Sequence, residues 1–294
     1  MSMYRLLAAA AALALATPAL PVLAQDTLDI AGRSEAARAA EETGRLMVDV
    51  QNATAIAQQQ YAGMTENAVT AGYMGAIAMP GEALGVWDTV IVGRRGEAED
   101  APFVALAEYE IAGGEITGEV IHTLADAPLL DGRASAMAQA RLFAPRAVIA
   151  AGNTGFCVGD GAQGSTVVFS TIVLPPREDG SFDAYVLNGP IEPGAIPLGK
   201  HFRVSFDAFG IDGEPTLLTD TCEVVTWDPA ADTAMNVYVT EYAGGSAPNE
   251  IHAFVSSLLP MSLGVVTGDE IWPMAGGMIA PPVPAAEAGY VSGE

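Results

Sequence analysis

The first 24 residues decide which part of this chain can enter a fold at all. Arg5 comes before an unbroken apolar run of 11 residues, Leu6 to Ala16, and the segment ends in the small residue Ala24. This order of charge, apolar run and small residue is typical of a secretory signal peptide. The run is shorter than the about 20 residues that a membrane-spanning helix needs. We therefore expect residues 1–24 to be removed, and the rest to be a soluble periplasmic or secreted protein without a membrane span after signal cleavage.

The charge of the chain limits its partners. It has 36 acidic residues against 12 Lys and Arg, a net charge of −24, and loss of residues 1–24 removes one basic residue and no acidic one. A surface this negative repels nucleic acid and anionic lipid head groups. Half of the residues are hydrophobic, which is enough apolar material for a packed core. The expected partner is a cation, a basic protein or a neutral ligand, and the sequence predicts no cofactor.

The chain has two cysteines, Cys157 and Cys222, which do not form a CxxC motif. In an exported protein an isolated pair of this kind predicts one structural disulfide. A metal site would need more ligands at suitable spacing, and the three histidines stand alone in the sequence. We therefore predict a Cys157–Cys222 bridge and no metal site.

The region 25–150 has the patterns of helices and hairpins. Apolar residues recur at helical spacing after Ser34, which is a candidate N-cap. The Gly-Gly pair at 113–114 is typical of a two-residue hairpin turn. Residues 61–85 match no pattern. The expected elements are a helix over 34–60, strands over 87–92, 103–111 and 115–122, and a helix over 131–144 that Asp131 caps and Pro145 ends or kinks.

The region 151–275 is rich in strand patterns, expected over 166–174, 182–187, 201–209, 216–219, 223–227, 236–242 and 262–267. Residues 250–258 alternate like a strand, although Asn249 is also able to open a helix; we favour the strand. Proline, glycine and alanine in 276–294 predict a disordered tail. The fold class is α+β: an N-terminal helix, antiparallel hairpins with one further helix, and then a β-rich C-terminal half, in one domain or two.

The hairpin at 113–114 brings two acidic residues together. A two-residue loop there places Glu108 opposite Glu119, with Cβ atoms about 5 Å apart. Two carboxylates at that separation suit a cation, or the acid/base pair of a retaining glycosidase. The alternative, which we favour, is that both side chains extend into water or that the register differs by one residue.

The strand at 201–207 supplies the second set of candidates. Alternation gives it an apolar face and a polar face, the latter made of His201, Arg203, Ser205 and Asp207. These are the group types of a hydrolytic site. Successive side chains on one face of a strand are parallel, however, and do not converge on one substrate. We therefore favour a solvated outer face over a catalytic row.

None of these patterns is a complete catalytic motif, and GxSxG does not occur in the chain. We therefore expect an exported protein that binds a partner or ligand, or serves the envelope, without catalysis. Two alternatives stay open. One is a carboxylate-dependent hydrolase, with a glycan as one conceivable substrate, that uses Glu108 with Glu119 or His201 with Asp207. The other is a cation-binding surface protein.

Overall fold

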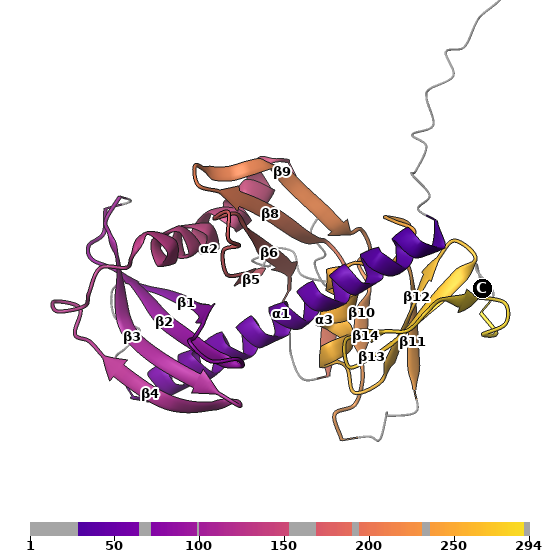
Figure 1. Cartoon of the computed structure of the whole chain (residues 1–294), viewed down its shortest axis with the longest axis horizontal. Helices are drawn as coiled ribbons and strands as arrows, with labels where there is room; N and C mark the ends of the chain where they lie inside the picture. Colours follow the sequence, from indigo (N-terminus) through magenta and orange to yellow (C-terminus); the bar gives the residue numbers. More distant parts are fainter. Residues whose placement is uncertain are drawn as a thin grey trace, which may run out of the picture.

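The computed structural model of the chain describes residues 29–64, 72–98, 100–152, 169–189, 194–230 and 236–290. Its class is α+β, as the sequence predicts, with three helices and several antiparallel sheets in these ranges. The helix α1 (Ile30–Met64) runs along the molecule and joins its two ends (Figure 1). Within the same ranges, no helix is both long enough and apolar enough to cross a membrane.

Two predictions fall on residues outside the described ranges. The candidate signal peptide, residues 1–24, is one of them. The other is the Cys157–Cys222 bridge, because Cys157 lies between the described residues 152 and 169, whereas Cys222 is described. Export and the disulfide therefore stay predictions.

The first sheet is antiparallel, in the order β1 (Tyr73–Pro80), β2 (Val86–Arg94), β3 (Phe103–Ala112) and β4 (Glu115–Ile121). The last three strands were predicted, and β1 lies in the segment that matched no pattern. Both faces of the sheet are covered at its centre: Ile91 and Tyr109 belong to a buried cluster shared with α1, and Ile77 and Val90 to one shared with α2 (Gly132–Ala150). A strand buried on both faces does not alternate, which is why β1 escaped notice.

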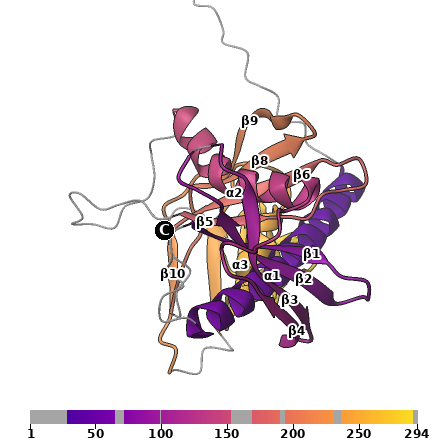
Figure 2. The same cartoon turned by 90° about the vertical axis from the view of Figure 1, so that its left-hand side faces the viewer.

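The helix α2 begins where the sequence predicts. A carboxylate oxygen of its N-cap, Asp131, accepts the Ala134 N–H at 2.8 Å. Pro145 does not end the helix, which continues to Ala150, so the first of the two predicted effects is wrong and the kink stays a prediction. The helix lies between the first sheet and a second one (Figure 2), with Met137 buried in their shared cluster. Packing on two sides outweighs the one backbone hydrogen bond that a proline removes.

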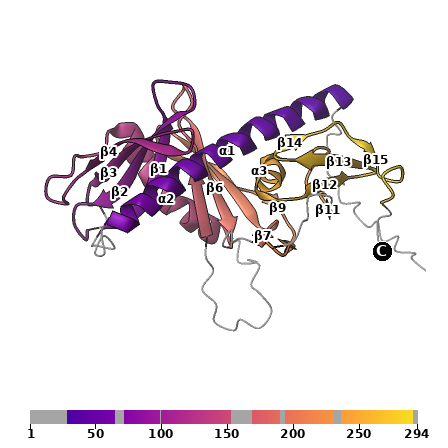
Figure 3. The ribbon, with the colours of Figure 1, turned by 90° about the horizontal axis from the view of Figure 1, so that it is seen from below.

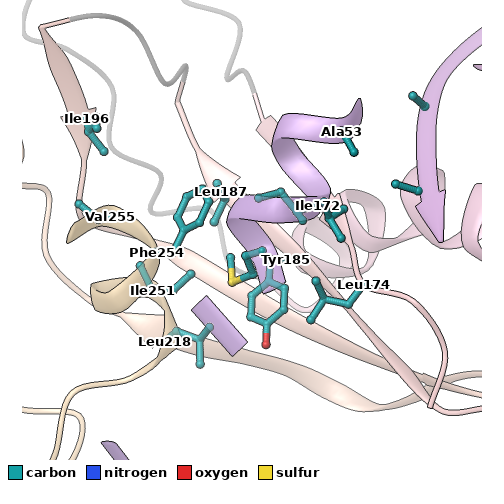
Figure 4. Packing of buried hydrophobic residues seen from close by; sticks show 14 of the residues in the cluster. Ala53, Ile172, Leu174, Tyr185, Leu187, Ile196, Leu218, Ile251, Phe254 and Val255 are labelled. Carbon is teal, nitrogen blue, oxygen red and sulfur yellow. The ribbon is translucent and has the colours of Figure 1, made fainter. Parts of the chain in front are cut away.

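The second sheet is also antiparallel, in the order β5 (Phe169–Val173), β6 (Phe182–Asn188), β8 (His201–Asp207) and β9 (Gly210–Thr219). On one face, Phe182 and Val204 pack against α2. On the other, Ile172, Tyr185 and Leu187 pack against α1 and α3 (Figure 4). The polar side chains that enter this second interface form the candidate site described below.

The segment 250–258 is a helix, α3 (Glu250–Leu258), so the strand that we favoured there is wrong. Its N-cap is Asn249, whose side-chain oxygen accepts the Ile251 N–H at 3.0 Å, while Nδ1 of His252 accepts the Asn249 N–H at 3.2 Å. Every residue from Glu250 to Ser256 is buried. A helix buried on all sides lacks the polar stripe by which a surface helix is recognised.

The C-terminal sheet follows the order β11 (Val237–Glu241), β12 (Ser262–Thr267), β13 (Glu270–Ala275) and β14 (Met278–Ile279), with β15 (Val283–Pro284) also paired to β13. A separate pair joins β7 (Ala195–Pro197) and β10 (Val224–Thr226). The strands β11 and β12 are parallel, with α3 as their crossover. Because β14 and β15 fold back on β13, the predicted disordered tail is wrong for residues 276–290.

The helices α1 and α3 lie side by side (Figure 3), and at Gly44 the backbone of α1 lies close to α3. A Cβ atom at this position would lie 2.7 Å from Cβ of Ala253 and 2.9 Å from the carbonyl oxygen of Glu250. The absence of a side chain at Gly44 therefore allows α3 to approach.

The start of α1 differs from the prediction. The helix begins at Ile30, and the hydroxyl of Ser34 donates to the Ile30 carbonyl at 2.9 Å from inside the helix. The oxygen that accepts a free N–H at the first turn belongs to Asp29, which accepts from Gly32 at 2.7 Å. Ser34 as the N-cap is therefore wrong, and the helix gains a further turn at its N-terminus.

Candidate functional site

The predicted carboxylate pair of the first sheet is not formed. The hairpin turns at Gly113–Gly114 as expected, but a β-bulge shifts the pairing of β3 and β4 by one residue. As a result Glu119 lies opposite Tyr109, and Glu108 lies opposite Val120. A shift of one residue turns a side chain to the other face of a sheet. Glu108 and Glu119 therefore lie on opposite faces, and the alternative that we favoured, a register that differs by one residue, is confirmed.

Each of these glutamates has its own neighbours. A carboxylate oxygen of Glu108 lies 2.9 Å from Nε2 of His122. Glu119, on the face toward α1, accepts a long hydrogen bond from Gln60 at 3.4 Å. Burial, and then the charge of Glu119, raise the pKa of Tyr109 to about 12. The two carboxylates thus belong to separate surfaces.

His201 is a structural residue and not part of a solvated face. It is 2% exposed. Its Nδ1 accepts the Asn188 N–H at 3.0 Å, and its Nε2–H donates to the carbonyl of Pro197 at 2.9 Å. Burial lowers the pKa of His201 to about 4. Both ring nitrogens are hydrogen-bonded to backbone groups, so neither serves as a general base. The prediction that His201 lies on a solvated outer face is wrong.

Asp207 holds the turn between β8 and β9. One carboxylate oxygen accepts the N–H groups of Phe209 and Gly210 at 2.7 and 3.0 Å. Glu108, Glu119, His201 and Asp207 therefore lie at four separate places. Of the residues singled out from the sequence, Arg203 is the one that lines a cavity together with other charged groups.

The Arg203 cavity lies between α1, the second sheet and the start of α3, and has a volume of about 450 Å³. Small-molecule sites in proteins occupy about 300–1,000 Å³. Small side chains of α1 form one wall. The opposite wall carries charge. The lining residues are Ala36, Ala39, Ala40, Thr43, Leu46, Leu174, Pro175, Arg177, Asp183, Tyr185, Arg203, Pro248, Asn249 and Glu250.

Glu250 is the centre of the first group of polar contacts. One of its carboxylate oxygens, Oε1, accepts from Nη1 of Arg203 at 3.2 Å and from the hydroxyl of Tyr185 at 3.1 Å. Burial is the largest single influence on Arg203 and lowers its pKa, but the charges of Glu250, Tyr185 and Asp183 together outweigh it and the pKa is raised. Burial and then Glu250 raise the pKa of Tyr185. The guanidinium and the phenol therefore keep their protons, and Oε2 of Glu250 accepts no hydrogen bond from the described residues.

Asp183 is the centre of the second group. It pairs with Arg177, from the loop between β5 and β6, and accepts from the hydroxyl of Ser205 at 2.7 Å. The side chains of Asp183 and Glu250 are 7% and 11% exposed, whereas those of Arg177 and Arg203 are 56% and 37% exposed. The two carboxylates thus lie behind two guanidinium groups, and the charges of the cavity balance.

In the described part of the chain, the polar groups of this arrangement are bonded to one another. The hydroxyl of Ser205 donates to a carboxylate, and no histidine contacts it in the described part of the chain. Tyr185 and Arg203 are held in their protonated forms, so neither removes a proton near neutral pH. The described ranges also hold no group of three or more His, Cys, Asp or Glu side chains placed for a metal ion.

Sequence reasoning missed most of this site. It singled out Arg203 and Ser205 for their alternation in β8, but not Asp183 and Tyr185, which alternate in the same way on β6. Glu250 was hidden because its segment resembles a strand. The sequence did contain a signal for this site: a polar residue at every second position of a strand that is otherwise apolar.

Comparison of the chain with protein-family models, with curated proteins and with solved structures finds no match.

Proposed function

We propose that this protein is exported and serves outside the cytoplasm as a non-catalytic binding protein. Its ligand site is the Arg203 cavity, and the ligand is a small polar molecule without net charge. Arg177 and Arg203 offset Asp183 and Glu250, so a ligand with a full charge gains no net attraction there. This balance of charges in a cavity of ligand size is the observation that carries the proposal.

Unused hydrogen-bonding capacity supports a ligand with both donors and acceptors. Oε2 of Glu250 is an acceptor without a described donor, and Arg203 donates through Nη1 to one described partner. A hydroxyl-rich or zwitterionic molecule satisfies both kinds of group. The hydrolase alternative depended on pairs of residues, Glu108 with Glu119 and His201 with Asp207, which do not meet. The Arg203 cavity is therefore the basis of the proposal.

Export is tested with the full chain carrying a C-terminal tag. We expect the protein in the periplasm or the medium, with a new N-terminus near Gln25, because Leu6–Ala16 follows a positive charge. A variant with an arginine in the apolar run, Leu13→Arg, should stay in the cytoplasm. Cytoplasmic, full-length wild-type protein would contradict export. Thiol labelling of the exported protein without reductant should find neither Cys157 nor Cys222.

Binding is tested by calorimetric titration with three uncharged or zwitterionic probes at millimolar concentration: glucose, glycerol and L-serine. We expect at least one probe to bind at one site and to be recovered unchanged by NMR. The variant Ala39→Trp fills the mouth of the cavity from the exposed face of α1 and should weaken binding at least tenfold. Ala55→Trp, also exposed on α1, is the matched control. Absence of binding for all three probes, or chemical conversion of one, would contradict the proposal.

A further inference from the structure

A second cavity, of about 570 Å³, lies farther along α1. It is bounded by α1, α2, the start of β1 and the edge strand β5. Its walls mix apolar side chains with amides and hydroxyls and carry one charged residue, Arg141 of α2. The lining residues are Gln51, Thr54, Ala55, Gln58, Met74, Arg141, Leu142, Pro145, Phe169, Ser170, Thr171 and Ile172.

The guanidinium of Arg141 is held in place by backbone. Its Nη1 donates to the carbonyl of Thr171 in β5 at 2.7 Å. Its Nε lies against Gly75 of β1, where a Cβ atom would come within van der Waals overlap. Gly75 has a φ of 102° and sits at a bulge of β1, a backbone conformation that favours glycine. The backbone of both strands, β1 and β5, thus lies directly against the guanidinium of Arg141.

The charge of Arg141 has no counterion among the described residues. It forms no ion pair there, and Thr171 is its one hydrogen-bond acceptor. Burial lowers the pKa of Arg141, and the nearest ionisable group that offsets this is the phenol of Tyr73 and not a carboxylate. A guanidinium has five N–H donors, and a buried charge without a partner costs several kcal/mol. In a chain of net charge −24, a buried arginine that faces no acid is unusual.

A second polar group in the same wall has no hydrogen-bond partner among the described residues. The side-chain oxygen Oε1 of Gln51 is buried and accepts no hydrogen bond from them. The neighbouring polar side chains of α1 are already bonded, Thr54 to the carbonyl of Val50 at 2.9 Å and Gln58 to the hydroxyl of Tyr73 at 2.7 Å. The cavity therefore offers one cation and one amide, beside apolar surface.

We infer that the Arg141 cavity binds a small organic monocarboxylate, with the carboxylate on Arg141 and the hydrocarbon part along Met74, Leu142 and Ile172. A guanidinium forms charge-assisted hydrogen bonds with a carboxylate, and the one hydrogen bond of Arg141 to a described residue uses only Nη1. One arginine balances one negative charge, and the acidic surface repels polyanions such as phosphate esters. The apolar part of the lining selects an organic acid over an inorganic anion. This site is independent of the Arg203 cavity and of the proposed function.

The test is calorimetric titration of the full mature protein with sodium hexanoate and sodium benzoate. We expect one site for at least one of them, and binding at least tenfold weaker for hexanamide, which has the shape of hexanoate without its charge. Arg141→Met should weaken carboxylate binding at least tenfold, and Ala55→Trp, which fills the cavity without touching Arg141, should do the same. Arg133→Met, an exposed arginine of the same helix, and Ala39→Trp should leave it unchanged.

Circular dichroism and thermal melting establish that each variant is folded, and Ala55→Trp keeps the test valid if Arg141→Met does not fold. The proposal is overturned if neither carboxylate binds, if hexanamide binds as well as hexanoate, or if both cavity variants bind like the wild type. Tighter binding of inorganic phosphate than of either carboxylate would also contradict it. A probe that binds through the Arg203 cavity is recognised by its loss in Ala39→Trp, so the two proposals fail separately.

Discussion

Two arginines line cavities of similar size beside α1, and their hydrogen-bond partners differ. Arg203 has the carboxylate of Glu250 at 3.2 Å, with the hydroxyl of Tyr185 on the same oxygen. Arg141 has the carbonyl of Thr171 at 2.7 Å and no described carboxylate. Burial next to a carboxylate makes an arginine part of the framework, whereas burial without one leaves its charge available to a ligand.

The largest expected difference between the two cavities is their response to acid. His201 and His252 lie on the Arg203 side, and burial lowers their pKa values to about 4 and about 3, from an ordinary 6.5. Below pH 6.5 the unfolded chain binds protons that the folded chain does not, so stability falls as the pH falls toward 4. We expect a loss of about 3 kcal/mol between pH 6.5 and 5, because each histidine costs about 1.4 kcal/mol per unit well below pH 6.5 and about half of that rate at pH 6.5 itself.

Urea unfolding across this range measures the loss, and hydrogen exchange locates it. Exchange should accelerate in α3 before α2. His252→Gln, which keeps an acceptor for the Asn249 N–H, should remove about half of the dependence on pH. Equal acceleration of hydrogen exchange in α2 and α3 would contradict the expected difference between the two cavities.

Removing one charged side chain from each cavity should change stability by different amounts. Glu250→Leu leaves Arg203 and Tyr185 without their acceptor, and we expect a loss of about 2 kcal/mol in urea unfolding, reduced by the partial exposure of Arg203. Arg141→Met removes a charge that has no carboxylate partner, and we expect a change below about 1 kcal/mol. A loss for Arg141→Met as large as that for Glu250→Leu would make Arg141 a framework residue too.

The contact of α1 with α3 belongs to the Arg203 side and should be sensitive to one methyl group. In Gly44→Ala the new Cβ would overlap Ala253 and the backbone of Glu250, and we expect a loss of about 1–2 kcal/mol. Gly63→Ala is the matched control in the same helix, because no atom lies within 4 Å of its new Cβ. That change should stabilise by about 0.5 kcal/mol. Equal results for the two alanines would contradict the close approach.

The smallest difference concerns two tyrosines. Tyr185→Phe removes a buried hydroxyl that donates to Glu250, and we expect a loss of about 1 kcal/mol. Tyr73→Phe removes a hydroxyl at the Arg141 cavity from a side chain that is 38% exposed, and the change should stay within about 0.5 kcal/mol. Urea unfolding of both variants at pH 7 measures the two changes in stability and shows which is larger.

Much of the secondary structure followed from local pattern. Alternation placed β2, β3 and β4 of the first sheet and the strands of the second sheet, and Asp131 marked the start of α2. Two failures have the same cause: α3 and β1 are buried on all sides, so the polar positions that mark an element's outer face are missing. The sequence signal for α3 was its N-cap, Asn249. We gave this signal less weight than the strand-like alternation of residues 250–258.

The candidate site was less accessible to prediction. The register of β3 and β4 depends on a bulge, which no turn residue announces, and one residue of shift separated Glu108 from Glu119. His201 is polar and was expected outside, yet its two nitrogens bind backbone groups of neighbouring segments. Only folding shows whether a polar residue on a strand faces water or a buried partner.

The amino-acid sequence settled the fold class, most of the strands and the net charge, because alternation, turn residues and composition can be read without tertiary contacts. It did not decide which arginine is neutralised. Glu250 is 47 residues from Arg203, and Thr171 is 30 residues from Arg141. Pairing across such separations depends on how α3 and β5 pack against α1, and that packing places a carboxylate beside one arginine and a carbonyl beside the other.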